Sequence, residues 1–215
     1  MARDTRSRLQ KRASRAGLFL NDELANGLVA YYELLYRWNR KINLTALADG
    51  DQAIDRLLIE PILAARHLPS TASFLHLDIG SGGGSPAIPM YLAVGGMELR
   101  MVEVKARKSA FLGEAVRHLN LERATVENAT YEELLARPEL HESCESVSVR
   151  AVRVETRVLT TLQAFLSIGG RLLLFRGPTG PEAPGVIVPP LAWTGTYPLL
   201  DSLQSRLTVL TKAVR

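Results

Sequence analysis

Residues 75–85 read Leu-His-Leu-Asp-Ile-Gly-Ser-Gly-Gly-Gly-Ser, a short apolar strand that runs directly into a glycine turn, with Asp78 just before the first glycine. Glycines permit positive φ angles and a close approach of the backbone to a ligand at a strand-to-helix junction. A second apolar stretch, 99–102, ends in Glu103. In doubly wound sheets, a carboxylate about 20 residues beyond such a turn binds the diol of a ribose. Together these features predict a site for a nucleotide-type cofactor.

The chain around this turn alternates strands and helices. We expect strands at 74–79, 98–104, 123–127, 146–151 and 170–176, separated by helices at 86–94, 107–120, 131–136 and 156–166. This rhythm predicts a parallel sheet with helices on both faces. After a long loop at 177–190, two strands at 194–197 and 207–211 have no helix between them, which indicates an antiparallel hairpin at the sheet edge.

Two helical stretches precede the sheet. Apolar and aromatic residues recur over 24–42 in steps of three and four, which is the period of one helix face, and Asn21 supplies a cap. The second stretch, 51–67, contains Pro61, which predicts a helix start or a kink near Glu60.

The positive charge of the chain is concentrated in clusters. Residues 1–16 hold six Lys or Arg and one Asp, a net charge of +5, whereas the whole chain carries +4, so the remaining residues sum to −1. Further clusters are Arg37/Arg40/Lys41, Lys105/Arg107/Lys108 and Arg150/Arg153/Arg157. Basic segments of this kind are typical of proteins that bind a phosphate backbone, and a solvated tail is the alternative for residues 1–16.

The C-terminal hairpin distinguishes two cofactor classes. A dinucleotide dehydrogenase would end its sheet with another parallel unit and would show G-x-G-x-x-G, but Ser85 stands at the third glycine position. A methyltransferase that uses S-adenosylmethionine (SAM) ends with an antiparallel strand and carries D-x-G-x-G, which Asp78, Gly80 and Gly82 match. We therefore predict the Rossmann-like α/β fold of class I SAM-dependent methyltransferases. The expected segments are a basic N-terminal arm at 1–20, a helical extension at 21–70 and the methyltransferase domain at 71–215.

Several blocks of the sequence resemble the RsmG (GidB) family. They occur in the family's order between about residues 20 and 177: Trp-Asn-Arg-Lys-Ile-Asn-Leu-Thr-Ala at 38–46, the glycine turn and its flanks at 77–89, Lys-Ser-Ala-Phe-Leu at 108–112, Ser-Val-Arg-Ala at 148–151, and Gly-Gly-Arg-Leu-Leu at 169–173 with Arg-Gly at 176–177. The resemblance implies an enzyme that uses SAM to methylate N7 of a guanine in 16S ribosomal RNA. Its partner would be ribosomal RNA or the small ribosomal subunit.

The predicted site combines the glycine turn with residues from later strands. The residues expected to hold the methionine and ribose portions of SAM are Asp78, Gly80, Gly82, Gly84, Ser85 and Glu103. The resemblance implies that Tyr131 and Glu132 border the adenine. Arg150, at the carboxyl end of a predicted strand, would contact the cofactor and act as the catalytic residue between cofactor and base.

The chemistry of guanine N7 needs no general base, because N7 carries a lone pair and no proton. Methyl transfer then depends on proximity and orientation. An arginine bound to N7 itself would block the reacting atom, so Arg150 is expected to contact O6 or a phosphate.

The sequence departs from the family pattern at Leu57, Glu60, Pro61, Thr130 and Arg176, positions around the predicted base pocket. These departures leave two alternatives open. One is a related methyltransferase that acts on another RNA or on a small molecule. The other is a SAM-binding, RNA-associated protein without catalysis.

Other features limit the possible classes of protein. Cys144 is the only cysteine, which excludes an internal disulfide and a zinc site built on cysteines. The four histidines have no ligand spacing, so we expect no metal. The apolar runs are too short to span a membrane. We expect a cytoplasmic monomer.

Overall fold

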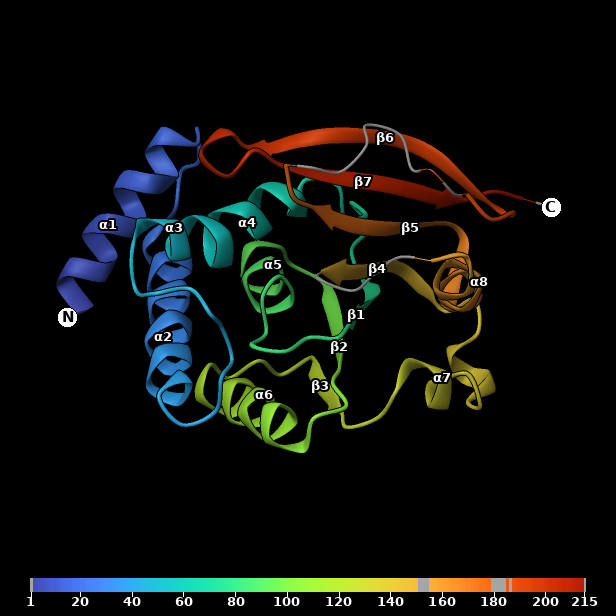
Figure 1. Ribbon diagram of the computed structural model, residues 1–215, viewed down its shortest axis with the longest axis horizontal. Helices are drawn as coiled ribbons and strands as arrows, with labels where there is room; N and C mark the ends of the chain where they lie inside the picture. The colour runs from blue at the N-terminus through green and yellow to red at the C-terminus, as the bar shows by residue number, and fades with distance from the viewer. Residues whose placement is uncertain (1, 151–154, 179–184, 186, 215) are drawn as a thin grey trace.

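A seven-stranded sheet lies at the centre of the protein (Figure 1). The computed structural model describes residues 2–150, 155–178, 185 and 187–214, so Arg153 and much of the loop predicted at 177–190 lie outside the described residues. The strands are β1 (Phe74–Ile79), β2 (Met97–Val102), β3 (Ala124–Glu127), β4 (Cys144–Arg150), β5 (Leu166–Arg176), β6 (Leu191–Leu200) and β7 (Ser205–Lys212).

The strand order is β3-β2-β1-β4-β5-β7-β6. The first five strands pair in parallel, whereas β7 is antiparallel to both of its neighbours, β5 and β6. The predicted parallel sheet with an antiparallel C-terminal hairpin is therefore confirmed.

Helices cover both faces of the sheet and enclose two apolar cores. The helices on the first face are α1 (Ala2–Arg15), α2 (Asp22–Asn39), α3 (Asp51–Ile54), α4 (Glu60–Ala65), α5 (Ala87–Ala93) and α6 (Ala106–His118). On the other face lie α7 (Tyr131–Leu134) and α8 (Thr156–Phe165). Leu77 and Ile79 of β1 belong to the core beneath α8. Because side chains alternate along a strand, His76 and Asp78 lie on the opposite face of the sheet.

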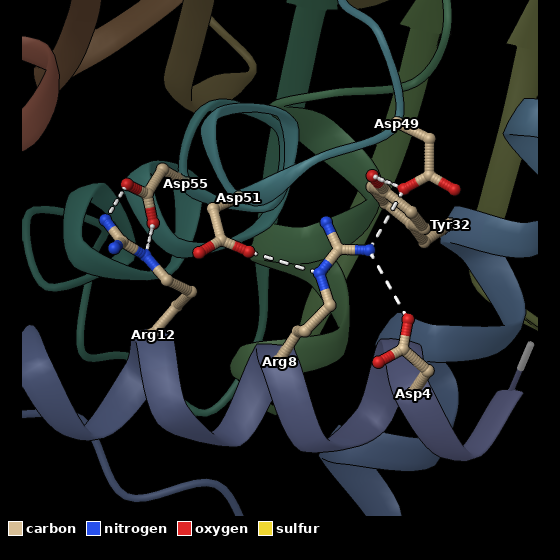
Figure 2. Close-up of polar contacts among 7 residues, drawn as sticks. All are labelled: Asp4, Arg8, Arg12, Tyr32, Asp49, Asp51 and Asp55. Atoms are coloured by element: carbon tan, nitrogen blue, oxygen red, sulfur yellow. Dashed lines mark hydrogen bonds and ion pairs between the residues drawn. The ribbon is translucent and has the colours of Figure 1, made fainter.

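The N-terminal segment, expected to be a basic arm, forms helix α1 instead. Leu9 and Ala13 lie one helical turn apart, so both are buried on the same face of this helix in the core that includes α2. Figure 2 shows that Arg8 and Arg12 point toward acidic side chains of the neighbouring segments. Their ion-pair partners are Asp4, Asp49, Asp51 and Asp55. Arg8 and Arg12, whose charge suggested a free arm, therefore form ion pairs within the fold.

The helix that contains Pro61 forms in three pieces: α3, a π-helical turn (Asp55–Ile59) and α4. The N–H of Glu60 donates to the carbonyl of Asp55, five residues back, whereas in an α-helix it would donate to Arg56. Pro61 has no N–H to donate to Leu57. Of the predicted helix start or kink near Glu60, the helix start is confirmed, because α4 begins at Glu60. The irregular hydrogen bonding leaves the carbonyls of Arg56 and Leu57 available to side chains.

Candidate active site

A cavity of about 300 Å³ lies at the carboxyl end of β1. In the sheet, β1 lies between β2 and β4, so the direction of the strand order reverses at β1. Ligands of open α/β sheets bind at this point of reversal. Four predicted site residues line the cavity: Gly80, Gly82, Ser85 and Arg150. The lining also includes Leu35 and Arg56 of the helical extension.

The glycine turn has the backbone geometry that its sequence predicts. Gly80, Gly82 and Gly84 have φ angles of 73°, 55° and 83°, a region that other residues adopt only at a cost. The hydroxyl of Tyr31, a buried residue of α2, donates to the carbonyl of Gly83 at 2.5 Å. This hydrogen bond thus connects the helical extension directly to the turn.

Gly84→Ala is expected to destabilise the protein by about 1–3 kcal/mol, because φ is positive and an added Cβ would lie 2.6 Å from Cδ1 of Ile88. Gly113→Ala, in the interior of α6, is the matched control. There the nearest atom to an added Cβ is 3.7 Å away, and alanine should stabilise the helix by about 0.4–1 kcal/mol. Urea denaturation of both variants measures the difference, and equal stabilities would contradict the strained geometry of the turn.

Asp78 lies beneath the turn with one carboxylate oxygen unpartnered. Its side chain is buried, and Oδ1 accepts a hydrogen bond from the hydroxyl of Ser148. Oδ2 is also buried and has no hydrogen-bond partner among the described residues. Burial raises the pKa of Asp78, while the hydrogen bond from Ser148 opposes that rise. A buried acceptor without a partner is costly, which indicates an oxygen available to a ligand.

Glu103 follows β2 and binds the turn. Its Oε2 accepts from the N–H of Gly82 at 2.9 Å, and its Oε1 accepts from the N–H of Lys105 at 2.8 Å. A carboxylate has about four lone-pair sites, so Glu103 can accept further hydrogen bonds. Asn128, which was not predicted from the sequence, donates to the carbonyl of Glu103 at 2.8 Å. The parallel pairing of β2 with β3 brings these two strand ends together.

These groups fit the cofactor predicted from the sequence. The unpartnered oxygen of Asp78 suits the cationic methionine portion of SAM, and the remaining lone pairs of Glu103 suit a ribose diol. The positive-φ turn between them allows a ligand to approach the backbone closely.

Arg150 is held in the cavity wall by partners from three segments. Its Nη2 pairs with Glu60, and its Nη1 donates to Ser85 Oγ at 2.9 Å and to the carbonyl of Arg56 at 3.1 Å. The guanidinium carbon lies 4.5 Å from the centre of the Phe175 ring. Burial lowers the pKa of Arg150, while the charge of Glu60 opposes this shift. The side chain is 11% exposed, so most of it faces protein.

Three departures from the family pattern, Leu57, Glu60 and Pro61, lie in the helical segment that contacts Arg150 and Ser85. Glu60 is fully buried and also accepts from Nη1 of Arg56 at 2.7 Å. The carbonyls made available by the π-helical turn are both used, because Arg56 accepts from Arg150 and Leu57 accepts from Ser85 Oγ at 2.9 Å. Glu60 therefore binds the guanidinium of Arg150 directly, and the helix irregularity before Pro61 leaves free the carbonyls that bind Arg150 and Ser85.

Tyr131 and Glu132 lie in α7, outside the residues that line the cavity. Tyr131 is half-buried and Glu132 is exposed. Thr130 begins this helix with a capping box, in which its hydroxyl and Glu133 bind each other's backbone N–H. The role of Tyr131 and Glu132 beside an adenine stays a prediction.

The described residues contain neither a candidate metal cluster nor a helix suited to a membrane. No group of three or more His, Cys, Asp or Glu side chains within that part of the chain is placed to hold a metal ion. None of the described helices has both the length and the apolar character needed to cross a membrane.

Comparison with known proteins supports the resemblance found in the sequence. The GidB family, described as rRNA small subunit methyltransferase G, matches residues 24–183. A relative from Stenotrophomonas maltophilia, named ribosomal RNA small subunit methyltransferase G, is 32% identical over 183 residues, which cover 85% of this chain and 74% of the relative. A relative of the same name from Carboxydothermus hydrogenoformans is 34% identical over 165 residues, which cover 75% of this chain and 68% of the relative.

A solved structure supports the fold in the same way. A SAM-dependent methyltransferase from Aquifex aeolicus aligns with a TM-score of 0.57 and 11% identity, covering 75% of this chain and 93% of that one. The fold and the family resemblance predicted from the sequence are thus confirmed. The chain belongs to the GidB family of ribosomal RNA small subunit methyltransferases.

Proposed function

We propose that this enzyme transfers a methyl group from SAM to N7 of a guanine in the 16S RNA of the small ribosomal subunit, in the cytoplasm. The observation that carries the proposal is the glycine turn at the strand-order reversal. There the buried Oδ2 of Asp78 has no partner among the described residues, and Glu103 can accept further hydrogen bonds. When bound, SAM supplies an electrophilic methyl group. Asp78, Glu103 and the turn would bind and orient it.

The cavity lining supports a reaction without a general base. Among the described residues that line it, none is a histidine or a carboxylate, and the charged ones are the cations Arg56, Lys108 and Arg150. Guanine N7 has no proton to remove, so orientation of the base beside the cofactor is sufficient. Cations at this position suit the O6 of a guanine and the phosphates of RNA.

Unpaired cations beside the cavity support an RNA-binding face. Arg37, Arg40 and Lys41 lie at the end of α2, and Lys105 and Arg107 at the start of α6; all are exposed, with no ion-pair partner in the part of the chain that the structure describes. The two helices are in contact, since the rings of Trp38 and Phe111 meet edge-on at 5.8 Å. Because Arg8 and Arg12 of α1 are already paired, we place the RNA backbone along the ends of α2 and α6.

The double variant Arg40→Ala/Lys105→Ala should bind 16S RNA more weakly and leave SAM affinity unchanged. The slope of log affinity against log salt should become shallower by about 0.7–0.9 for each phosphate that the variant no longer binds. Lys11→Ala/Arg15→Ala removes two exposed cations of α1, which have no ion-pair partner among the described residues, and is the matched control. Filter binding across a salt series compares the two variants. A larger fall in RNA affinity for the α1 variant would restore the N-terminal segment as the RNA anchor.

Nucleoside mass spectrometry of small-subunit RNA from cells with and without the gene tests the proposed function. We expect 7-methylguanosine at one site to disappear when the gene is removed and to return when it is restored. An unchanged 16S modification pattern would contradict the proposal.

A further inference from the structure

A chain of buried hydrogen bonds runs beneath the glycine turn and ends at Asp78. His76 is fully buried in β1, where its Nδ1 lies 2.7 Å from Ser146 Oγ and its Nε2 lies 2.9 Å from Ser148 Oγ. The hydroxyl of Ser148 donates to Oδ1 of Asp78. The parallel register of β1 with β4 pairs His76 with Ser146 and Asp78 with Ser148, so the four side chains share one face of the sheet.

The number of available protons sets the direction of these bonds. An ionised Asp78 only accepts, so it takes the single hydroxyl proton of Ser148. Nε2 of His76 must then donate to Ser148, and Nδ1 must accept from Ser146. Burial lowers the pKa of His76 to about 3, so the ring is neutral and carries one proton. With Asp78 ionised, that proton lies on Nε2.

We propose that His76 is a positioning residue for the cofactor site, because its donation to Ser148 commits the Ser148 proton to Oδ1 of Asp78 and leaves Oδ2 as the acceptor for the cofactor. Without a donor at Nε2, the Ser148 hydroxyl is free to turn toward the ring, and the carboxylate loses the bond that fixes its orientation. The inference rests on the SAM site and is independent of the RNA target.

The first test compares SAM affinity, measured by calorimetry, in two variants of His76. His76→Phe removes both ring nitrogens and should weaken SAM binding about tenfold, the size of one hydrogen bond. His76→Gln keeps an N–H donor on a side chain of similar reach and should restore most of the affinity. Thr208→Val is the control, because it removes another buried hydroxyl of the sheet, one paired with Thr196.

A double-mutant cycle with Ser148→Ala tests whether the effect passes through Ser148. Adding His76→Phe to Ser148→Ala should cost little further affinity, because the link to Asp78 is already gone. A folded His76→Phe protein with wild-type SAM affinity, or additive losses in the cycle, would overturn the proposal. The cycle uses no RNA, so its outcome does not depend on whether the protein methylates 16S RNA.

Nitrogen-15 NMR of the imidazole provides a readout that does not depend on a bound ligand. We expect His76 in the free protein at neutral pH to show a protonated Nε2 and an unprotonated Nδ1. If Asp78 were protonated, donor and acceptor would exchange roles in each of these hydrogen bonds, and the imidazole proton of His76 would lie on Nδ1. A protonated Nδ1 would therefore overturn the assignment even if a His76 variant lost affinity through instability.

Discussion

Replacing Arg150 with alanine should lower methyl transfer by about 10²–10³-fold, the loss typical of one preorganised polar contact at a reacting centre. The same change should destabilise the protein by about 3–5 kcal/mol, because Glu60, which is fully buried, would lose one of its two cationic partners. Single-turnover methyl transfer and urea denaturation measure the two effects. SAM affinity should fall much less than the rate.

Two further variants separate the stability effect from the catalytic one. Glu60→Leu/Arg150→Met removes both charges and should recover much of the stability but none of the activity. Arg66→Ala removes an exposed arginine at the end of α4 and should change neither quantity. Full turnover by a folded Arg150→Ala protein would show that Arg150 only supports the wall of the cavity.

Replacing Arg12 with alanine should destabilise the protein by about 2–4 kcal/mol, because it breaks a buried ion pair. Asp55 is 3% exposed, and it accepts from Nε of Arg12 at 2.7 Å and from Nη2 of the same side chain (Figure 2). It also accepts from Ser202 Oγ at 2.7 Å. Without Arg12, the hydroxyl of Ser202 would be the one remaining partner of this carboxylate among the described side chains. Asp55 also begins the π-helical turn that supplies Arg56 to the cavity, so the rate of methyl transfer should fall as well.

Arg6→Ala is the matched control on the same helix. Arg6 pairs with Asp22, whose side chain is 89% exposed, and exposed pairs contribute about 0–1 kcal/mol. Urea denaturation of both variants should therefore give clearly different stabilities. Equal losses for Arg6→Ala and Arg12→Ala would contradict the role of Asp55 as a buried anchor for α1.

The parts of the fold that follow from local patterns were predicted from the sequence. The strand before Asp78, the glycine turn and the acid after the second strand are close in sequence and have a fixed chemistry. The C-terminal hairpin followed from the absence of a helix between two strands. The spacing of hydrophobic residues and the presence of turn-forming residues were sufficient to predict each of these elements.

Contacts between distant segments were not predictable in the same way. Arg150 meets Glu60 across 90 residues, and Glu60 appeared in sequence only as a departure from the family pattern. His76 was only one of four histidines without ligand spacing in the sequence, because its link to Asp78 depends on the register of β1 with β4. Helix α1 was missed because its apolar face is only a few residues wide and its charges suggested a free arm.

Methyl transfer by the purified protein tests the central claim most directly. The protein is incubated with SAM carrying a labelled methyl group and with either naked 16S RNA or small ribosomal subunits, and the nucleosides are then separated by mass spectrometry. We predict labelled 7-methylguanosine at a single position, with transfer greatly reduced in Arg150→Ala. SAM binding with no labelled nucleoside from either substrate would contradict the account.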